Sequence, residues 1–290
     1  MRIWKSIGLS LSLLIASNVG MSAAAGQRGK VLIVMSGAHQ LELRDGKKYT
    51  TGYYLDELAV PLRRMIDAGY SPVFASPNGE APSIDPSSNN AMFFEGKDTL
   101  LADALKLVHS RKDLEHPRSL AAVLAAGTTE YVGLFIPGGH APMQDLLKDR
   151  DLGRILSAFH QTNRATGVIC HGPVALLSAV PDPERFQQAM AAGDFDAAGK
   201  LAKGWPYAGY RLTVFSSAEE HKLEGAASQL GGSVLFYAAD ALAQAGAHVD
   251  HLALWQSNVV EDRELVSGQQ PFSSDAVGAA FVAKLNATHP

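Results

Sequence analysis

The sequence predicts an α/β fold: a doubly wound, mainly parallel sheet with a small helical insertion. Short runs rich in Val, Ile and Leu, typical of buried parallel strands, alternate with segments whose apolar residues recur at helical spacing. Hydrophobic residues make up 47% and charged residues 19% of the 290 residues, which is ordinary for a folded protein. A chain of this length can bury a core without disulfides.

A parallel βαβ unit begins the predicted sheet. Residues 30–36 (KVLIVMS) form an apolar run typical of a buried strand. Over residues 54–68 the apolar positions recur at helical spacing, and Gly69 follows where a helix commonly ends. Residues 71–76 (SPVFAS) form the next strand, so the strand–helix–strand order predicts parallel pairing.

The alternation resumes after an insertion at about residues 91–130, which contains a helical stretch with scattered charges. We expect further strands at residues 131–137, 167–170 and 211–216, and helices at residues 146–159, 173–179, 235–245 and 275–285. Neither G-x-G-x-x-G nor G-x-x-x-x-G-K-[ST] occurs in the sequence, so dinucleotide and P-loop sites lack support.

The first 25 residues have the order of a secretory signal peptide. Arg2 and Lys5 precede an apolar stretch at residues 7–16, and Ala23-Ala24-Ala25 offers a small-residue cleavage site. The stretch is shorter than the roughly 20 residues that span a bilayer. We therefore expect a periplasmic or secreted protein whose residues 26–290 form a single domain; a retained N-terminal anchor is the alternative.

Charge and cysteine content exclude several classes of function. There are 25 Lys and Arg against 29 Asp and Glu, so the formal charge of −4 gives no electrostatic reason to expect nucleic acid or a membrane surface as partner. One cysteine excludes an internal disulfide framework and a zinc site of several thiolates, and histidines such as His109, His116 and His160 show no metal-ligand spacing. We expect neither a metal nor a cofactor.

Two predicted strands end in sequences suited to chemistry, at the sheet edge where ligands bind in such folds. One ends in Gly138-Gly139-His140, and the other in Cys170-His171 immediately before a helix. The second is a strand–nucleophile–helix turn, in which the helix N-terminus favours the thiolate. The N–H groups of His171 and Gly139 are the expected oxyanion donors. The alternative is that Cys170 is an inert, buried residue.

These motifs resemble the ThiJ/PfpI superfamily, relatives of the class I glutamine amidotransferase domain. The resemblance spans nearly all of residues 26–290. Its other matching segments are Thr51-Gly52-Tyr53-Tyr54-Leu55-Asp56-Glu57, Ala75-Ser76-Pro77-Asn78-Gly79, Phe215-Ser216-Ser217-Ala218-Glu219-Glu220 and Leu265-Val266-Ser267-Gly268-Gln269-Gln270-Pro271. It implies a flavodoxin-like fold, and the insertion resembles that of the heat-shock chaperone and glyoxalase III branch.

The resemblance also implies roles for individual residues. Cys170 matches the family nucleophile, and Glu57 matches the glutamate that hydrogen-bonds the cysteine and moves protons. Asp56 and Glu57 are neighbours that face different directions, so only one of them can point at the sheet end. His171 matches the second catalytic residue, although its ring could instead face away from the thiol, because adjacent side chains seldom meet.

An acid that orients His171 would complete a Cys-His-acid triad. Alignment to this branch places it at Glu220, with Glu219 as the alternative. Both could also be surface carboxylates at a helix start, where negative charge is favourable. We expect His140 to line the mouth of the substrate pocket.

The resemblance implies a cysteine-dependent, glutathione-independent glyoxalase, a lyase for methylglyoxal detoxification in a stress response. The resemblance further implies a small 2-oxoaldehyde as substrate, D-lactate as product and a homodimer as the assembly. The first alternative is an amidase or peptidase of the PfpI type that uses Cys170, His171 and Glu220 in acyl transfer. The second is a protein without turnover, either a holding chaperone or a redox sensor.

Overall fold

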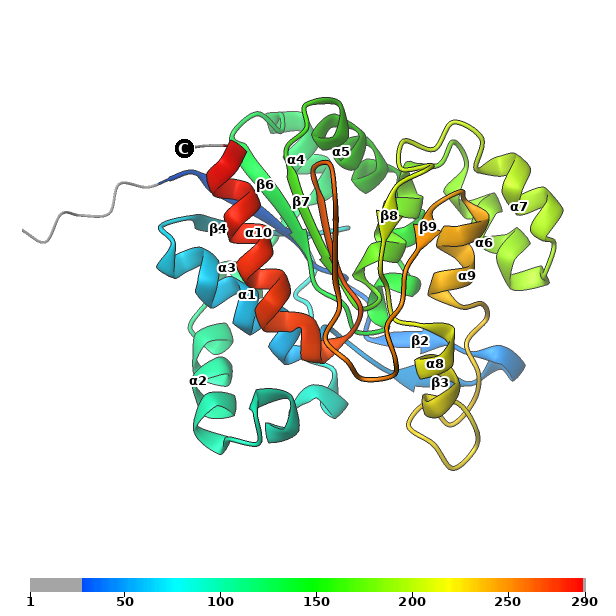
Figure 1. Ribbon diagram of the computed structural model, residues 1–290, viewed down its shortest axis with the longest axis horizontal. Helices are drawn as coiled ribbons and strands as arrows, with labels where there is room; N and C mark the ends of the chain where they lie inside the picture. The colour runs from blue at the N-terminus through cyan, green and yellow to red at the C-terminus, as the bar shows by residue number, and fades with distance from the viewer. Residues whose placement is uncertain (1–27, 289–290) are drawn as a thin grey trace, which may run out of the picture.

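The computed structural model describes residues 28–288. A seven-stranded sheet lies at its centre, with helices packed around it (Figure 1). The strand order is β10 (Val259–Asp262), β11 (Leu265–Gly268), β7 (Ala165–Ile169), β6 (Tyr131–Ile136), β1 (Lys30–Val34), β4 (Ser71–Ser76) and β5 (Arg118–Ser119). Only the β10–β11 pair is antiparallel. This arrangement confirms the predicted doubly wound, mainly parallel sheet.

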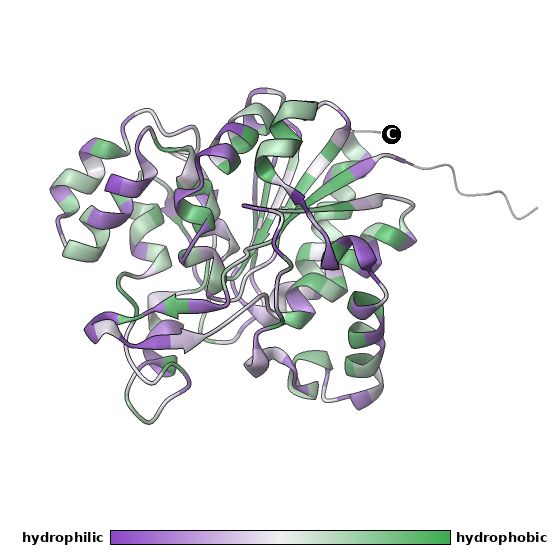
Figure 2. Ribbon diagram, turned by 180° about the vertical axis from the view of Figure 1, so that it is seen from behind, coloured by the Kyte–Doolittle hydropathy of each residue, from purple (hydrophilic) through white to green (hydrophobic). Residues whose placement is uncertain are grey.

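Helices cover both faces of the sheet. On one face lie α1 (Leu55–Asp67) and α10 (Ser274–Thr288), with α2 (Asp98–His109) and α3 (Lys112–Glu115) beside α1; on the other lie α4 (Leu120–Ala126) and α5 (Arg150–Gln161). The interior strand β1 shows why both faces need cover: Leu32 and Val34 belong to one hydrophobic core, and Val31 and Ile33 belong to the other. The central strands are therefore apolar along their length, as Figure 2 shows.

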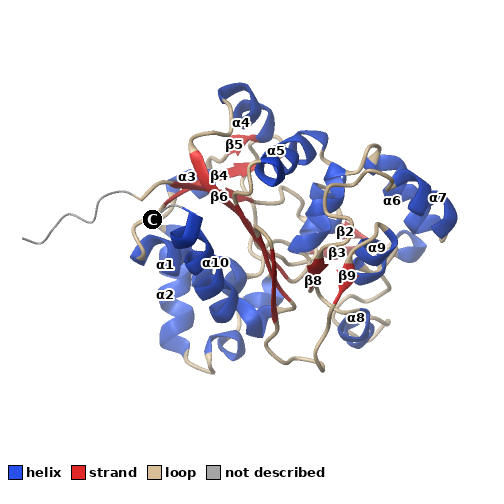
Figure 3. Ribbon diagram, turned by 45° about the horizontal axis from the view of Figure 1, so that its top comes forward, coloured by secondary structure: helices blue, strands red, loops and turns tan. Residues whose placement is uncertain are grey.

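A second group of elements packs beside the carboxyl ends of the strands (Figure 3). It comprises α6 (Pro183–Ala192), α7 (Phe195–Leu201), α8 (Ser217–Leu223), α9 (Ala238–Gln244) and two small sheets, β2 (Gln40–Glu42) with β3 (Lys48–Thr50) and β8 (Arg211–Leu212) with β9 (His248–Val249). Short 3₁₀ helices complete the chain: η1 (Arg44–Gly46), η2 (Pro86–Ser88), η3 (Ala91–Phe94), η4 (Ala141–Met143), η5 (Leu146–Lys148), η6 (Gly172–Ala179) and η7 (Pro271–Ser273).

Several predicted elements differ in extent from the observed ones. The strand expected at residues 211–216 is wrong in length, because only Arg211–Leu212 pairs, and it pairs with β9 outside the central sheet. After Leu212, the Thr213 N–H donates to the Ser267 hydroxyl, so a hydrogen bond to a side chain takes the place of backbone strand pairing. The helix expected at residues 146–159 is divided into η5 and α5 at Asp149, whose side chain caps α5.

The insertion is more than helical. It contains α2, α3 and α4, and it also supplies β5, which pairs with β4 at the sheet edge. The predicted signal peptide lies outside the described residues. Among residues 28–288, none of the helices has the length and apolar character needed to cross a membrane.

One core contact gives a test of the packing. Phe281 of α10 is fully buried, and its ring centroid lies 5.4 Å from that of Phe135. It occupies space left by Gly133 and Gly167, because a Cβ on these glycines would lie 3.2 Å and 2.8 Å from the Phe281 ring. Phe281→Ala should lower the free energy of unfolding in urea by about 3–5 kcal/mol. The matched change at exposed Phe195 should alter it by less than about 0.5 kcal/mol; equal losses would contradict this packing.

Candidate active site

Cys170 occupies a sharp turn between β7 and η6. Its φ is +59°, a left-handed conformation that non-glycine residues adopt only where the surroundings hold them. Two backbone hydrogen bonds hold this one: Cys170 N donates to Gly268 O, and Phe215 N donates to Cys170 O, both at 2.9 Å. The turn is a nucleophile elbow built from the ends of neighbouring segments.

Two glycines after β6 let another strand end approach the thiol. A Cβ on Gly138 would lie 2.6 Å from Cys170 Cβ and 2.7 Å from Glu57 Oε2. Gly139 has φ +82°, and its Cβ would lie 2.1 Å from Gly52 O. Because these positions have no side chain, the N–H of Gly139 can reach the sulfur, together with that of His171, and both lower the pKa of the thiol. They lie where the sequence predicted oxyanion donors.

Glu57 reaches the thiol from the first turn of α1. Its side chain is completely buried, and its Oε2 accepts from Gly138 N at 3.0 Å. Its Oε1 has no partner among the described residues. Burial and then the charge of Asp56 raise the pKa of Glu57 well above the usual range of a glutamate. This carboxyl is therefore suited to holding a proton near neutral pH.

The thiol itself differs from the expectation that a helix N-terminus would favour the thiolate. Burial, and then the charge and hydrogen bonding of Glu57, raise the pKa of Cys170 well above its usual range. The two N–H donors oppose this without overcoming it. The expectation is wrong because the thiol is 3% exposed beside a carboxyl, and desolvation outweighs a single 3₁₀ helix end.

His171 points at Cys170 after all, and Glu220 holds it there. The distance from Cys170 Sγ to His171 Nδ1 is 3.4 Å, and from His171 Nε2 to Glu220 Oε2 it is 2.7 Å. The Phe215 ring stacks on the imidazole with centroids 4.7 Å apart. If Nε2–H donates to Glu220, then Nδ1 is free to accept the thiol proton. The geometry is that of a Cys-His-acid triad.

His140 lies behind this triad and not at a pocket mouth. Its side chain is buried, its Nε2 lies 2.8 Å from Glu220 Oε1, and its ring centroid is 4.1 Å from that of His171. The sequence placed it at the strand end but could not show that the turn aims it inward. Glu220 thus accepts hydrogen bonds from two histidines at once.

The contacts of Glu220 with His140 and His171 control the pKa values of all three side chains. Burial alone would lower the pKa of His140, but the Glu220 charge and hydrogen bond raise it above its ordinary value. Burial and the charge on His140 lower the pKa of His171. The two histidines hold the pKa of Glu220 well below its usual range despite burial. The two histidines therefore shift in opposite directions: contact with Glu220 favours the charged form of His140, whereas burial and His140 favour the neutral form of His171.

Glu219, the alternative triad acid, has a different position. It forms a capping box with Ser216 at the start of α8. Its Oε1 also accepts from Trp255 N at 2.9 Å and from the Gln269 amide at 3.2 Å. These contacts tie α8 to the loop before β10 and to the end of β11, so Glu219 holds the scaffold while Glu220 faces His171.

His140, His171 and Glu220 have ligand atoms within 4.8 Å of one another and could in principle hold a metal ion. Both Nε2 atoms, however, already lie at hydrogen-bond distance from the carboxylate, so an ion would have to displace those protons.

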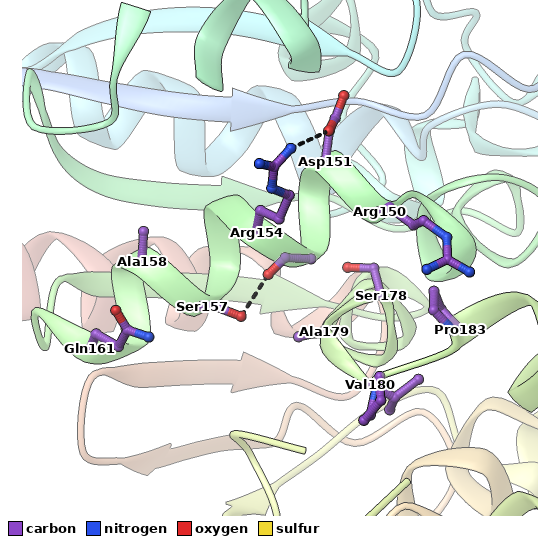
Figure 4. Close-up of a pocket in the computed structure, with 12 residues that line it drawn as sticks. Arg150, Asp151, Arg154, Ser157, Ala158, Gln161, Ser178, Ala179, Val180 and Pro183 are labelled. Atoms are coloured by element: carbon purple, nitrogen blue, oxygen red, sulfur yellow. Dashed lines mark hydrogen bonds and ion pairs between the residues drawn. The ribbon is translucent and has the colours of Figure 1, made fainter. Parts of the chain in front are cut away.

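A surface hollow of about 600 Å³ lies elsewhere, between α5 and the end of η6 (Figure 4). Its arginines, Arg150 and Arg154, are paired with Asp182 and Asp151. It contains none of the residues around Cys170.

The ThiJ/PfpI family-like sequence profile matches residues 49–201, more than half of the chain. The chain belongs to this family. A relative from Staphylococcus aureus, named protein/nucleic acid deglycase HchA, is 26% identical over 263 residues, covering 87% of this chain and 78% of the relative.

Solved structures with the same fold include Rapid Encystment Protein 24 KDa of Francisella tularensis, with 24% identity and a TM-score of 0.62 over 89% of this chain and 99% of that one. Glyoxalase III of Candida albicans has 20% identity and a TM-score of 0.63 over 89% and 98%. These likenesses support the flavodoxin-like ThiJ/PfpI fold.

The raised pKa of the Cys170 thiol gives a test by alkylation. Its reaction with iodoacetamide should rise with pH to a midpoint above about 8.5, the usual value of a free cysteine. Glu57→Gln removes the neighbouring negative charge, so the midpoint should fall by about 1 pH unit or more. The same change at exposed Glu184 on α6 should leave it unmoved. An unshifted midpoint in the Glu57 variant would show that this carboxyl does not control the thiol.

Proposed function

We propose that this ThiJ/PfpI protein is a cofactor-free glyoxalase of the lyase class that converts methylglyoxal, a 2-oxoaldehyde, to D-lactate. The observation that carries the proposal is the position of buried Cys170 and Glu57 on either side of Gly138, with the N–H groups of Gly139 and His171 beside the thiol. This arrangement supplies a nucleophile, a proton carrier and an oxyanion site within one small volume.

Each reaction step has a residue suited to it. The sulfur of Cys170 adds to the aldehyde carbon while the thiol proton passes to Glu57 or His171, and the oxygen accepts hydrogen bonds from the two N–H groups. The group that took the thiol proton passes it to the new oxyanion, which gives a hemithioacetal. Glu57 then removes the proton of the former aldehyde carbon and delivers it to the ketone oxygen, forming an enediol. Glu57 next takes the hydroxyl proton of the sulfur-bearing carbon and delivers it to the adjacent carbon, which gives the lactoyl thioester, and water hydrolyses this to D-lactate and the free thiol.

Burial of the thiol favours a small substrate. Cys170 is 3% exposed, so an aldehyde of a few atoms reaches it more readily than an adduct on a macromolecule. The name of the Staphylococcus aureus relatives includes protein and nucleic acid as substrates. For this chain we propose the free 2-oxoaldehyde as the main substrate.

A cysteine hydrolase is the second candidate, because the contacts from Cys170 through His171 to Glu220 have the geometry that acyl transfer uses. Acyl transfer requires His171 to take the thiol proton and become positive. The charge of His140 opposes this, since it lowers the pKa of His171. Glu57 has no such opposing charge, so we place it first as proton carrier.

The first experiment follows D-lactate from methylglyoxal without glutathione, using the chain from residue 26 with its thiol reduced. The wild type should form D-lactate, and Cys170→Ala should form none because the nucleophile is gone. A folded wild type that forms no D-lactate would overturn the glyoxalase and bring forward the hydrolase, chaperone and redox-sensor alternatives.

The two carboxyls distinguish the two reactions. Glu57→Gln should lower kcat for methylglyoxal by about 10²- to 10⁴-fold, the range for a lost general acid–base group. Glu220→Gln removes the charge and the acceptor for one of the two histidines, but it leaves Glu57 and the oxyanion donors in place, so it should cost about tenfold or less. The reverse order would favour a triad mechanism in which Glu220 orients a charged His171.

We also propose that the protein is exported and cleaved after Ala25. Mass spectrometry of the periplasmic or secreted protein should find Gly26 at the N-terminus; a full-length cytoplasmic chain would contradict this. A homodimer remains a proposal that light scattering on the same sample can test.

A further inference from the structure

Asp56 is a second completely buried carboxyl on the first turn of α1, and the proposed reaction does not use it. Its neighbour Glu57 faces Gly138, whereas Asp56 faces α10, where its Oδ2 lies 2.7 Å from the Ser274 hydroxyl. Its Oδ1 has no partner among the described residues. A buried carboxylate with one hydroxyl contact and one free oxygen is costly, so the group needs an explanation.

The hydrogen bonds of Ser274 indicate where a proton lies. The Ser274 oxygen is 2.7 Å from Asp56 Oδ2 and also 2.7 Å from Pro271 O. A hydroxyl has one proton to donate, and a carbonyl oxygen can only accept. The Asp56 carboxylate therefore shares its one side-chain donor, the Ser274 hydroxyl, with the Pro271 carbonyl oxygen, which leaves a charge on Asp56 poorly compensated. The two contacts together fit a neutral Asp56.

The electrostatic surroundings of Asp56 also favour its neutral form. Burial raises the pKa of Asp56 to about 7, although Ser274 and backbone N–H groups oppose it. The Asp56 charge in turn raises the pKa of Glu57, which Asp85 also raises and the hydrogen bond to Cys170 lowers. On α10 the nearest charge in sequence, Asp275, is paired with Arg64 at 2.5 Å. Two adjacent buried carboxyls cannot both be ionised at low cost, so their titrations are linked.

We propose that Asp56 is a positioning residue that stores a proton beside Glu57 and so controls whether Glu57 can accept a proton from Cys170 or the substrate. The proposal rests on the proposed function for its consequence in turnover. Its electrostatic part concerns the Cys170–Glu57 pair alone and can be measured without any substrate.

The test is Asp56→Asn, read by two pH profiles. The amide can still donate to the Ser274 oxygen, but it carries no charge. The midpoint of Cys170 alkylation by iodoacetamide should therefore fall by about 1 pH unit, because the thiolate and Glu57 no longer face a second negative charge. The limb of kcat/KM for methylglyoxal that rises with ionisation of Glu57 should move to lower pH by a similar amount.

Asp275→Asn is the matched control, since it makes the same chemical change at an exposed residue of α10, and it should shift neither profile. Ser274→Ala is the second variant, for use if Asp56→Asn fails to fold. Without the hydroxyl, Asp56 should stay neutral to higher pH, so both profiles should move in the same direction by a smaller amount.

The outcomes separate this inference from the proposed function. A shifted alkylation midpoint in a protein that forms no D-lactate would overturn the glyoxalase and leave the role of Asp56 intact. An alkylation midpoint within about 0.2 pH unit of wild type in a folded Asp56 variant would overturn the inference, whatever the turnover.

Discussion

The close approach of two backbone segments beside Cys170 is the constraint on which the rest of the site depends. Gly138 lies between Cys170 and Glu57, and a single Cβ there would overlap both. The same absence of side chains lets the Gly139 N–H face the sulfur. Nucleophile, carboxyl and oxyanion donors can therefore share one small volume only because the end of β6 is bare backbone.

Burial then decides how the charges in that volume behave. On one side of the thiol, Glu57 and Asp56 are buried with no salt-bridge partner within residues 28–288, so both retain protons more strongly than exposed acids. On the other side, Glu220 is buried with two histidines and stays ionised. Glu57 can therefore carry a proton, whereas Glu220 stays charged and orients His171. The first property suits proton transfer between carbons, and the second suits acyl transfer.

The parallel sheet makes this division possible. Elements far apart in sequence bring their ends to one edge: α1 supplies Glu57, the turn after β6 supplies His140, the elbow after β7 supplies Cys170, and α8 supplies Glu220. Each is held by its own local device, such as the Ser216–Glu219 capping box that fixes the start of α8. Because each site residue comes from a different element, one of them can change without altering the sheet that positions the others.

The sequence by itself determined the sheet and the elbow, because both follow from local patterns. Apolar runs and helical spacing predict where the central strands and α1 lie, and a cysteine between a strand and a glycine-proline turn predicts a nucleophile elbow. It missed the β2–β3 and β10–β11 hairpins, whose strands have three or four residues and mixed polarity.

Only the tertiary structure decided the electrostatics. The expected thiolate is a thiol of raised pKa, because desolvation depends on what surrounds Cys170 and not on the helix that follows it. Likewise, His140 is buried against Glu220, and the choice between Glu219 and Glu220 follows from which carboxylate α8 turns toward His171. Sequence spacing places such residues at one sheet edge, but distances between segments set their charges, and those arise only when the chain has folded.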